Sequence, residues 1–406
     1  MVFENIKKNL DKVSSILNIS DKEMALLLKH KSIKHTKLSL EGKEYDAWRI
    51  IHNNALGPGK GGIRFHPNVS EDEVKSLSFW MSLKDSLAKL PYGGAKGGIK
   101  INARELSKEQ KEKISREYIK AFHEFLGQDR DVAAPDVNTN AEVMGWMLDE
   151  YEHIKGHHEP AMITGKPIEL GGCSLREEAT GRGGFIILDL FLKKQQKQPK
   201  ELSIAIQGFG NVGRNIAKIL HDNGYNIVAV SDVKGGIYDS TGLDIEKLML
   251  HSAETGSVVE FEGTEPITNE QLLSLEVDVL IPAALEDQIT KQNAESIKAK
   301  YILEMANGPI TADADDILYD KGKIVIPDIL ANSGGVVVSY IEWSQNKSGN
   351  IHTLEAMKSV LINKMGSAFH RTYEFHQDKK VSMRQAAYAL AIKRILTAER
   401  LRGNLK

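Results

Sequence analysis

Hydrophobic spacing divides the first 150 residues into helical and extended segments. Apolar positions recur at steps of three and four over residues 3–17, which predicts an amphipathic opening helix. Ser20 and Glu23 have the spacing of a capping box and predict the start of a second helix. Alternating runs on either side of Glu41 and Gly42 predict a β-hairpin. Further helices are predicted over residues 70–89, 107–126 and 140–153.

The middle of the chain has a different pattern. Between about residues 200 and 330, short apolar runs alternate with helix-like segments, which is typical of βαβ units around a parallel sheet. After residue 335 the spacing is helical again, and Ser382 with Gln385 predicts the cap of a last helix that reaches about Leu401. The fold is therefore predicted to be α/β, with one α/β segment inserted between two stretches that belong together.

A glycine-rich turn follows the first strand of this middle segment. In a strand–turn–helix context, Gly208 can make the tight turn, Gly210 admits a pyrophosphate, and Gly213 permits close packing of the helix. The N-terminus of that helix favours phosphate. The turn is therefore a candidate dinucleotide site, and its sequence is Gly208-Phe209-Gly210-Asn211-Val212-Gly213.

An acidic residue ends the next predicted strand. Asp232 lies nineteen residues beyond Gly213, where a carboxylate can bind the 2′-hydroxyl of a ribose. A carboxylate at this position repels a 2′-phosphate and favours NAD over NADP, although the nearby Lys234 weakens that preference. The alternative interpretation is a glycine-rich turn of an ordinary α/β strand, with Asp232 as a surface turn residue.

Composition excludes several other classes of function. The chain has 406 residues, of which 27% are charged and 41% hydrophobic, as in globular proteins. Its 53 basic and 55 acidic residues give a net charge of −2, so no overall field favours nucleic acid or an anionic membrane. Cys173 is the only cysteine, and no run of 18 apolar residues occurs. We therefore expect a cytoplasmic protein whose partners are small molecules or proteins.

Three lysines occupy positions that are unusual for a cation. Lys60 lies in a glycine-rich turn, glycines on both sides of Lys96 leave its backbone open to close approach, and Lys84 falls in the apolar stripe of its predicted helix. If the three converge, repulsion and desolvation lower the pKa of at least one, and together they can clamp a dianionic substrate. The alternatives are a Lys84 that extends to solvent and three unrelated lysines.

An acid and two histidines lie near these lysines in the sequence. Asp136 follows an apolar run and precedes a helix whose cap is Asn138 or Asn140. We interpret Asp136 as a proton carrier beside the lysines, with a helix-capping loop acid as the alternative. His52 and His66 have no companions at metal-ligand spacing, so no metal is predicted.

Seven motifs follow one another along nearly the whole chain. They are GPGKGGIRFHP (57–67), LPYGGAKGGI (90–99), APDVNTN (134–140), ITGKP (163–167), GFGNVG (208–213), EMANGP (304–309) and DILANSGGVVVSYIEW (328–343). Together they resemble the glutamate dehydrogenase branch of the Glu/Leu/Phe/Val dehydrogenase family. The resemblance implies reversible, NAD(P)-dependent oxidative deamination of L-glutamate to 2-oxoglutarate and ammonium by hydride transfer.

The resemblance also implies roles for individual residues. Lys96 matches the catalytic lysine, and Asp136 matches the aspartate that exchanges protons with the substrate amine. Lys84 matches the lysine that holds the substrate α-carboxylate. Lys60 and Ser339 match the pair that recognises the side-chain carboxylate of glutamate.

The same resemblance implies the architecture and the cofactor site. We expect a substrate-binding and oligomerisation domain over residues 1–174, completed by C-terminal helices 340–406, and a Rossmann-like NAD(P)-binding domain over 175–339. The cofactor is expected to be NAD, with NADP not excluded, and the assembly a homohexamer. The residues that match the nicotinamide end of the family's cofactor site are Thr180, Asn211, Asn307 and Asn332.

Two alternative functions remain open. A catalytically silent homologue that regulates a partner would be expected to lose Lys96 or Asp136, and both are present. The substrate of a leucine, valine or phenylalanine dehydrogenase has no side-chain carboxylate for Lys60 and Ser339 to bind, so this pair argues against that function.

Overall fold

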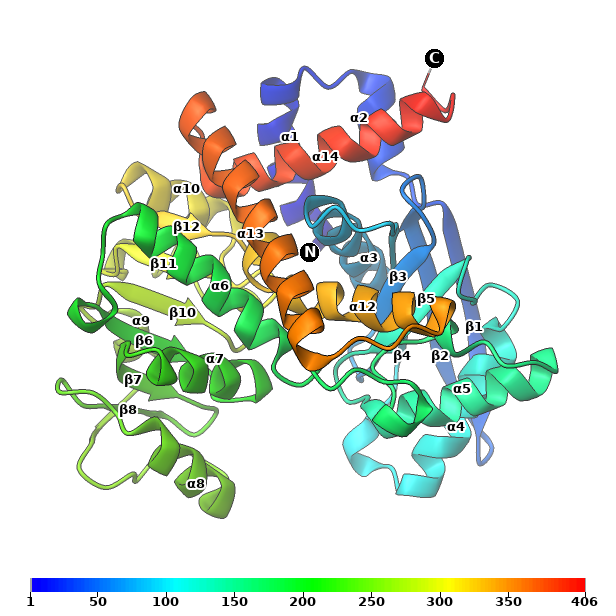
Figure 1. The fold of residues 1–406 in the computed structure, drawn as a ribbon, viewed down its shortest axis with the longest axis horizontal. Coiled ribbons are helices and arrows are strands. Elements are labelled where there is room, and N and C mark those ends of the chain that lie inside the picture. Colours follow the sequence, from blue (N-terminus) through cyan, green and yellow to red (C-terminus); the bar gives the residue numbers. More distant parts are fainter. Residues whose placement is uncertain (1, 406) are drawn as a thin grey trace. The chain divides into compact units, whose positions relative to one another are not determined.

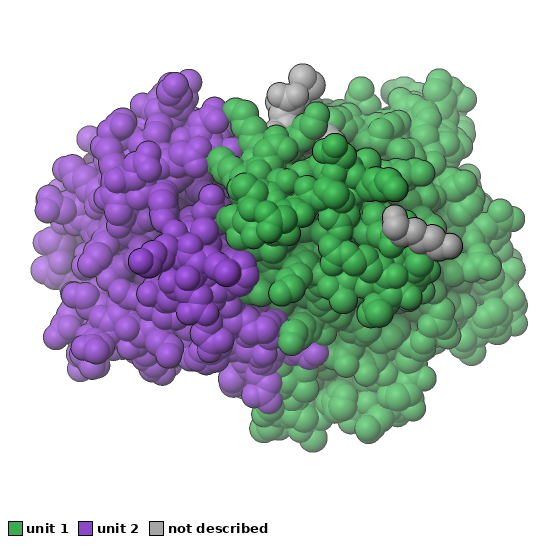
Figure 2. Space-filling view, turned by 90° about the horizontal axis from the view of Figure 1, so that it is seen from above, with its two compact units in different colours: residues 1–176, 336–360, 388–406 green, residues 177–335, 361–387 purple. Residues whose placement is uncertain are grey.

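A computed structural model describes residues 2–405, except for the side chains of residues 2–5, and the chain forms two compact units (Figure 1). Unit 1 comprises residues 1–176, 336–360 and 388–406. Unit 2 comprises residues 177–335 and 361–387, and both units are coloured in Figure 2.

Unit 1 is built on a five-stranded mixed sheet. The predicted hairpin is present as an antiparallel pair, and the two strands on the far side of the sheet run parallel to their neighbours. The strand order is β1-β2-β4-β3-β5. The strands are β1 (Ser32–Leu40), β2 (Lys43–Asn53), β3 (Gly59–Phe65), β4 (Gly94–Ile99) and β5 (Asp131–Pro135).

Helices cover both faces of this sheet. The predicted opening helix and the capping box of Ser20 and Glu23 are confirmed. Helices α4 and α5 lie side by side on one face (Figure 1), and α3 packs on the other face against Trp48 and Ile50. The helices are α1 (Val2–Leu17), α2 (Asp21–Leu28), α3 (Glu71–Leu87), α4 (Lys108–Phe122) and α5 (Ala141–Lys155).

Unit 2 contains the predicted parallel sheet. The five predicted strands are parallel and adjacent, with fully buried apolar side chains that explain their continuous hydrophobic runs. Two three-residue strands, β8 and β9, extend the sheet in antiparallel fashion and were too short to give a sequence pattern. The order is β12-β11-β10-β6-β7-β8-β9. The strands are β6 (Ser203–Gln207), β7 (Asn226–Ser231), β8 (Gly236–Tyr238), β9 (Glu265–Ile267), β10 (Val279–Pro282), β11 (Tyr301–Leu303) and β12 (Ile324–Ile326).

The helices of unit 2 follow the strands in alternation, which confirms the α/β fold class. Apolar side chains of the sheet and of the later helices form one core. The helices are α6 (Ala179–Lys194), α7 (Asn211–Asp222), α8 (Ile245–Thr255), α9 (Asn269–Leu273), α10 (Ala312–Asp320) and α11 (Asp328–Ala331).

The C-terminal helices are divided between the units, which corrects one prediction. The whole stretch 340–406 was assigned to the first domain, but residues 361–387 belong to unit 2. The reason is packing, since Phe369 and Tyr373 contact one another and Tyr373 also contacts Phe191 of α6. The helices are α12 (Gly334–Ser348), α13 (Leu354–Lys379) and α14 (Met383–Leu401).

Helix α14 is divided between the units, and each part of it contacts residues of its own unit. Ser382 and Gln385 form the predicted cap at its start. Arg384, in unit 2, pairs with Glu304. One turn later Tyr388, in unit 1, accepts a hydrogen bond from Nε1 of Trp80 at 3.0 Å.

Candidate active site

Strand register brings four charged side chains of unit 1 to one face of the sheet. Ile63 lies opposite Gly97 of β4 and opposite Pro135 of β5. Side chains alternate along a strand, so residues an odd number of positions away from Ile63, Gly97 and Pro135 point to the opposite face of the sheet. That face carries Lys60, Arg64, Lys96 and Asp136.

Asp136 joins two cations. Its Oδ1 lies 2.9 Å from Nζ of Lys96, and its Oδ2 accepts a hydrogen bond from Nε of Arg64 at 2.7 Å. Arg64 also pairs with Glu73 of α3. Burial alone would raise the pKa of the Asp136 carboxyl, but Lys96 and Arg64 outweigh it and hold that pKa well below its usual range. Asp136 is therefore ionised and oriented at both oxygens.

Burial lowers the pKa of two of the predicted lysines. Lys96 is buried on β4, and desolvation lowers its pKa although Asp136 opposes the shift. Lys60 is buried on β3, its Nζ donates to the carbonyl of Ala133 at 3.3 Å, and desolvation lowers its pKa to about 7. The predicted lowering is present, but the cations that add to it are arginines rather than the other lysines, namely Arg64 for Lys96 and Arg176 and Arg49 for Lys60.

A hydroxyl and a guanidinium meet close to Lys60. Nη1 of Arg176 donates to Oγ of Ser339 on α12 at 2.8 Å. Arg176 was missed by the sequence analysis, because it stands in the charged run Arg176-Glu177-Glu178, which is typical of a solvated surface. The structure places this guanidinium where it lowers the pKa of Lys60 by charge repulsion.

A buried ion pair fixes the helix that carries Ser339. Glu342 lies one turn further along α12, and it pairs with Nζ of Lys166 at 2.9 Å. The same carboxylate accepts the backbone N–H of Gly165 at 2.8 Å. The ITGKP segment is thereby attached to α12, which restricts the position of Ser339.

Asp85 and Tyr92 carry buried polar atoms that have no hydrogen-bond partner among the described residues. Lys84 is buried, at 7% exposure, as its place in the apolar stripe predicted. Both carboxylate oxygens of the fully buried Asp85 and the hydroxyl of Tyr92 lack a hydrogen-bond partner among the described residues. Burial raises the pKa of Asp85 well above its usual value, and Lys60 and Lys84 oppose that shift. Buried polar atoms are seldom left without a partner, so a polar ligand or a water molecule can bond here.

The glycines around Lys60 and Lys96 are explained by the protein's own packing. A Cβ atom at Gly61 would lie 1.6 Å from the carbonyl oxygen of Ala95, and one at Gly94 would lie 2.2 Å from the backbone nitrogen of Ser82. The close approach predicted from these glycines is therefore made by β4 and α3.

The glycine-rich turn of unit 2 has the geometry of a phosphate site. Gly208 has φ of +96°, and a Cβ atom at Gly213 would lie 1.8 Å from the Gly208 carbonyl oxygen. Among the described residues, nothing lies within 4 Å of a Cβ built at Gly210, which begins α7 as a cap without a side-chain hydrogen bond. The twelve-residue helix α7 thus presents open backbone N–H groups, and these residues, with Asn211 and Val212, fit a dinucleotide.

Three other predicted cofactor residues belong to unit 2, one on α6 and one on each of the segments that follow β11 and β12. Thr180 lies in the first turn of α6. This helix packs closely against α7, since a Cβ at Gly181 would lie 2.9 Å from Cβ of Asn215. Asn332 donates through Nδ2 to Oδ1 of Asn307 at 3.1 Å. Its own Oδ1 is buried and has no partner among the described residues, so it can accept a hydrogen bond from a carboxamide.

The Asp232 carboxylate already accepts hydrogen bonds from other residues of the protein. Its carboxylate accepts hydrogen bonds from the backbone N–H groups of Lys234 and Val258 and from Oγ of Ser257, each at 2.7 Å. A carboxylate has about four acceptor positions, so one remains for a ribose hydroxyl. Asp232 therefore braces the turn after β7 in addition to any contact with a cofactor.

Comparison with known proteins agrees with this arrangement. The sequence profile described as Glutamate/Leucine/Phenylalanine/Valine dehydrogenase matches residues 171–403, and the profile of the Glu/Leu/Phe/Val dehydrogenase dimerisation domain matches residues 31–153. The chain belongs to the Glu/Leu/Phe/Val dehydrogenase family. This membership confirms the resemblance found in the seven motifs.

Several members of this family are similar over most of their length. The NADP-specific glutamate dehydrogenase of Saccharolobus shibatae is 45% identical, over 98% of this chain and 96% of its own. The NAD-specific glutamate dehydrogenase of Staphylococcus aureus strain COL is also 45% identical, over 89% of this chain and 87% of its own. The hetero-hexameric glutamate dehydrogenase of Thermus thermophilus, solved in a Leu-bound form, superimposes with a TM-score of 0.94 at 29% identity, covering 100% of this chain and 98% of its own.

The described residues contain neither a metal-binding cluster nor a membrane-spanning helix. Across residues 2–405, no group of three or more His, Cys, Asp or Glu side chains is arranged to hold a metal ion. Within the same range, every helix is too short or too polar to span a bilayer.

Proposed function

We propose that this protein is a glutamate dehydrogenase that reversibly converts L-glutamate, NAD(P)⁺ and water to 2-oxoglutarate, ammonium and NAD(P)H. Glutamate is favoured over the other amino-acid substrates of the family by one observation, the group formed by Lys60, Arg176 and Ser339. Lys60 and Ser339 are buried and Arg176 is half-buried. Two cations and a hydroxyl close together suit a second carboxylate, because a desolvated carboxylate needs charged and hydrogen-bonding partners. An apolar side chain offers these two cations neither a negative charge nor a hydrogen-bond acceptor.

Lys84, Lys96 and Asp136 are proposed to act on the amino-acid end of the substrate. Lys84 would bind the α-carboxylate, and the cofactor, when bound, would accept the hydride from Cα to leave an iminium. Neutral Lys96 would then take a proton from the water that attacks the iminium carbon. Asp136 would carry protons to the nitrogen as the carbinolamine collapses and ammonium leaves. Support comes from the lowered pKa of Lys96 and its 2.9 Å contact with Asp136.

Unit 2 is proposed to bind the dinucleotide. The residues proposed for the pyrophosphate are Gly208, Gly210, Val212 and Gly213. Asp232 would bind the adenosine ribose, and Thr180, Asn211, Asn307 and Asn332 would bind the nicotinamide end. Relatives of both cofactor classes are about equally similar to the chain, so NAD is proposed as the preferred cofactor on the strength of Asp232 alone.

Assembly and location are proposed from a related structure and from the cysteine content. The Thermus thermophilus relative is a hetero-hexamer, and we propose a homohexamer for this chain, with a mass six times the 45.1 kDa of one copy. A cytoplasmic location agrees with a single cysteine, Cys173, that is buried and reduced. Light scattering of the purified chain tests the assembly.

The double variant Lys60→Leu with Ser339→Val tests the choice of substrate. It leaves the side-chain carboxylate of glutamate short of a cation and a donor, so kcat/KM for glutamate should fall by about 10³-fold or more, while norvaline should lose far less. The matched control is Lys347→Leu, which removes an exposed lysine from the same helix as Ser339. Retention of the parent's preference for glutamate over norvaline in the double variant would refute the assignment of Lys60 and Ser339.

A further inference from the structure

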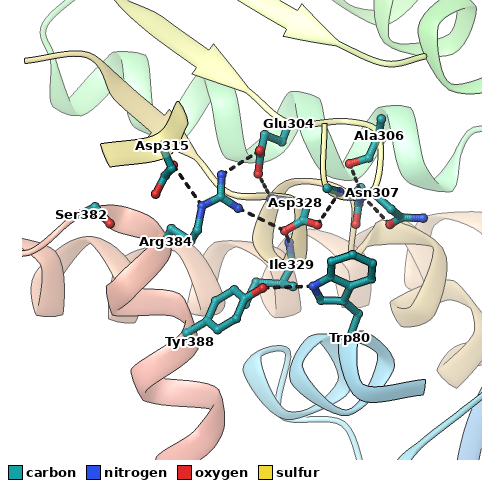
Figure 3. A network of polar contacts seen from close by, with 12 residues as sticks. Trp80, Glu304, Ala306, Asn307, Asp315, Asp328, Ile329, Ser382, Arg384 and Tyr388 are labelled. Carbon is teal, nitrogen blue, oxygen red and sulfur yellow. Dashed lines mark hydrogen bonds and ion pairs between the residues drawn. The ribbon is translucent and has the colours of Figure 1, made fainter. Parts of the chain in front are cut away.

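One arginine of the last helix meets three buried acids of unit 2 (Figure 3). Arg384 is 5% exposed and lies in the first turn of α14. Its Nη2 is 2.7 Å from Glu304, its Nε is 3.0 Å from Asp315, and its Nη1 is 3.7 Å from Asp328. These three acids come from different segments, namely the end of β11, helix α10 and the start of α11.

Two of the three acids connect the loops that follow β11 and β12. The second oxygen of Glu304 accepts the backbone N–H of Asp328 at 2.8 Å. Asp328 in turn accepts the backbone N–H of Gly308 at 3.0 Å and that of Ile329 at 2.7 Å. The loop 304–309 and the segment 327–333 are therefore joined to each other through carboxylates that Arg384 holds.

Each of these loops carries one of the asparagines assigned to the nicotinamide end. Asn307 is next to Gly308, and Asn332 lies one turn after Asp328. The side-chain nitrogen of Asn332 donates to Oδ1 of Asn307 and to the carbonyl of Ala306, both at 3.1 Å. This fixes the rotation of the Asn332 amide, so that its unpartnered Oδ1 is the atom left for a ligand.

We propose that Arg384 is a positioning residue for the nicotinamide end of the cofactor site. Arg384 itself touches no reacting atom in this account. It acts through Glu304 and Asp328, which set the relative position of Asn307 and Asn332. The proposal rests on the function proposed above, because it takes these two asparagines to contact the nicotinamide.

The charges in the cluster indicate that the positions of the two loops depend on the Arg384 guanidinium. Burial raises the pKa of Glu304 to about 7 despite Arg384, and the neighbouring Asp328 and Asp315 raise it further. Removal of the guanidinium would leave three buried carboxylates without their cation, and such groups either take up protons or move toward water. A protonated carboxyl group accepts the hydrogen bonds between the two loops less strongly, and a displaced one does not accept them, so either response loosens the loops.

The test compares two ligands that differ only at the nicotinamide. Kd is measured by calorimetry for NADH and for ADP-ribose, which lacks the nicotinamide but retains the pyrophosphate and adenosine. The variants are Arg384→Met, the conservative Arg384→Lys, and Lys393→Met as the control, since Lys393 is an exposed cation of the same helix.

We expect Arg384→Met to weaken NADH by about tenfold, the equivalent of one or two lost hydrogen bonds, with ADP-ribose unchanged. In the same variant kcat should fall by about 10²-fold through misplacement of the ring, with KM for glutamate unchanged. Arg384→Lys should be intermediate, and the control Lys393→Met should match the parent.

Equal weakening of NADH and ADP-ribose in both arginine variants would overturn the proposal, because it would show a general defect of unit 2. Unchanged NADH binding in Arg384→Lys and Arg384→Met would overturn it as well. If Arg384→Met does not fold, the NADH and ADP-ribose affinities of Arg384→Lys decide by the same criteria. Failure of the proposed function is distinguishable, because it would appear as absence of glutamate turnover in the parent protein, whatever the binding data.

Discussion

Asp136→Asn removes one negative charge from the candidate catalytic group with almost no change in shape. In the parent, one oxygen of Asp136 lies 2.9 Å from Nζ of Lys96 and the other accepts from Nε of Arg64 at 2.7 Å. An asparagine can accept from one of these cations through its carbonyl oxygen. Its NH₂ group then faces the other cation, donor against donor, and it can carry no proton at either position.

The expected loss of activity follows from these contacts. Asp136 raises the pKa of Lys96 against the effect of burial, so its neutralisation should lower that pKa further. Loss of a positioned proton carrier typically costs about 10²–10⁴-fold in rate, or about 3–5 kcal/mol of activation free energy. Breaking a buried ion pair costs about 3–5 kcal/mol of stability. The stability cost should fall at the low end here, because Arg64 keeps Glu73 as a partner.

The assay measures kcat for glutamate oxidation at saturating cofactor, at a temperature well below the Tm of the variant. Asp129→Asn is the matched control, because Asp129 pairs with Lys347 at the surface and contributes about 1 kcal/mol or less. We expect the control to resemble the parent and Asp136→Asn to lose at least 10²-fold in kcat, with little change in NADH affinity. A kcat near that of the parent in folded Asp136→Asn would refute the role of Asp136 as proton carrier.

Two further predictions concern pH and cofactor preference. Because burial lowers the pKa of Lys60 to about 7, the free protein loses this charge as the pH rises through that value, and the Kd of glutarate should rise about tenfold per pH unit above it. Lys60→Met should bind glutarate weakly at every pH, and a flat profile in the parent would contradict the assignment. The parent should use NAD with a higher kcat/KM than NADP, and Asp232→Ser should reduce that ratio by about tenfold through loss of charge repulsion. An unchanged ratio would show that Asp232 only braces its turn.

Much of the fold could be predicted because local signals agree with the tertiary structure. The hairpin around Glu41 and Gly42, the parallel strands of unit 2 and the caps at Ser20 and Ser382 are all present. The cap of α5 is Asn140, one of the two asparagines predicted for it. Strands β8 and β9 were missed because three residues are too few to show alternation.

The charged environment of the candidate site could be predicted only in part. Glycine spacing and an apolar stripe drew attention to Lys60, Lys84 and Lys96. Their arginine neighbours come from remote segments, and charged residues in polar runs give no sign of burial. Arg64 alone had a usable signal, since it follows Lys60 by four positions on an alternating strand and so shares its face. Arg176 and Arg384 meet their partners only in the folded chain.

The division of α13 and α14 between the units was likewise invisible in the sequence. The sequence after residue 335 shows only a continuous helical pattern. The changes of partner at residues 361 and 388 depend on which apolar and charged groups other segments present. Arg384 and Tyr388 are one helical turn apart, yet they belong to different units. Periodicity gives the face of a helix that is buried, but it does not identify the partner.

The most direct test of the proposed function is an initial-rate comparison of L-amino acids with the purified parent protein. Glutamate, leucine, valine, phenylalanine and norvaline are each supplied with NAD and with NADP, and reduction of the cofactor is followed by absorbance. The account predicts that glutamate has the highest kcat/KM with either cofactor, because the group formed by Lys60, Arg176 and Ser339 suits a second carboxylate. A higher kcat/KM for leucine, valine or phenylalanine, or no reduction with glutamate, would contradict it.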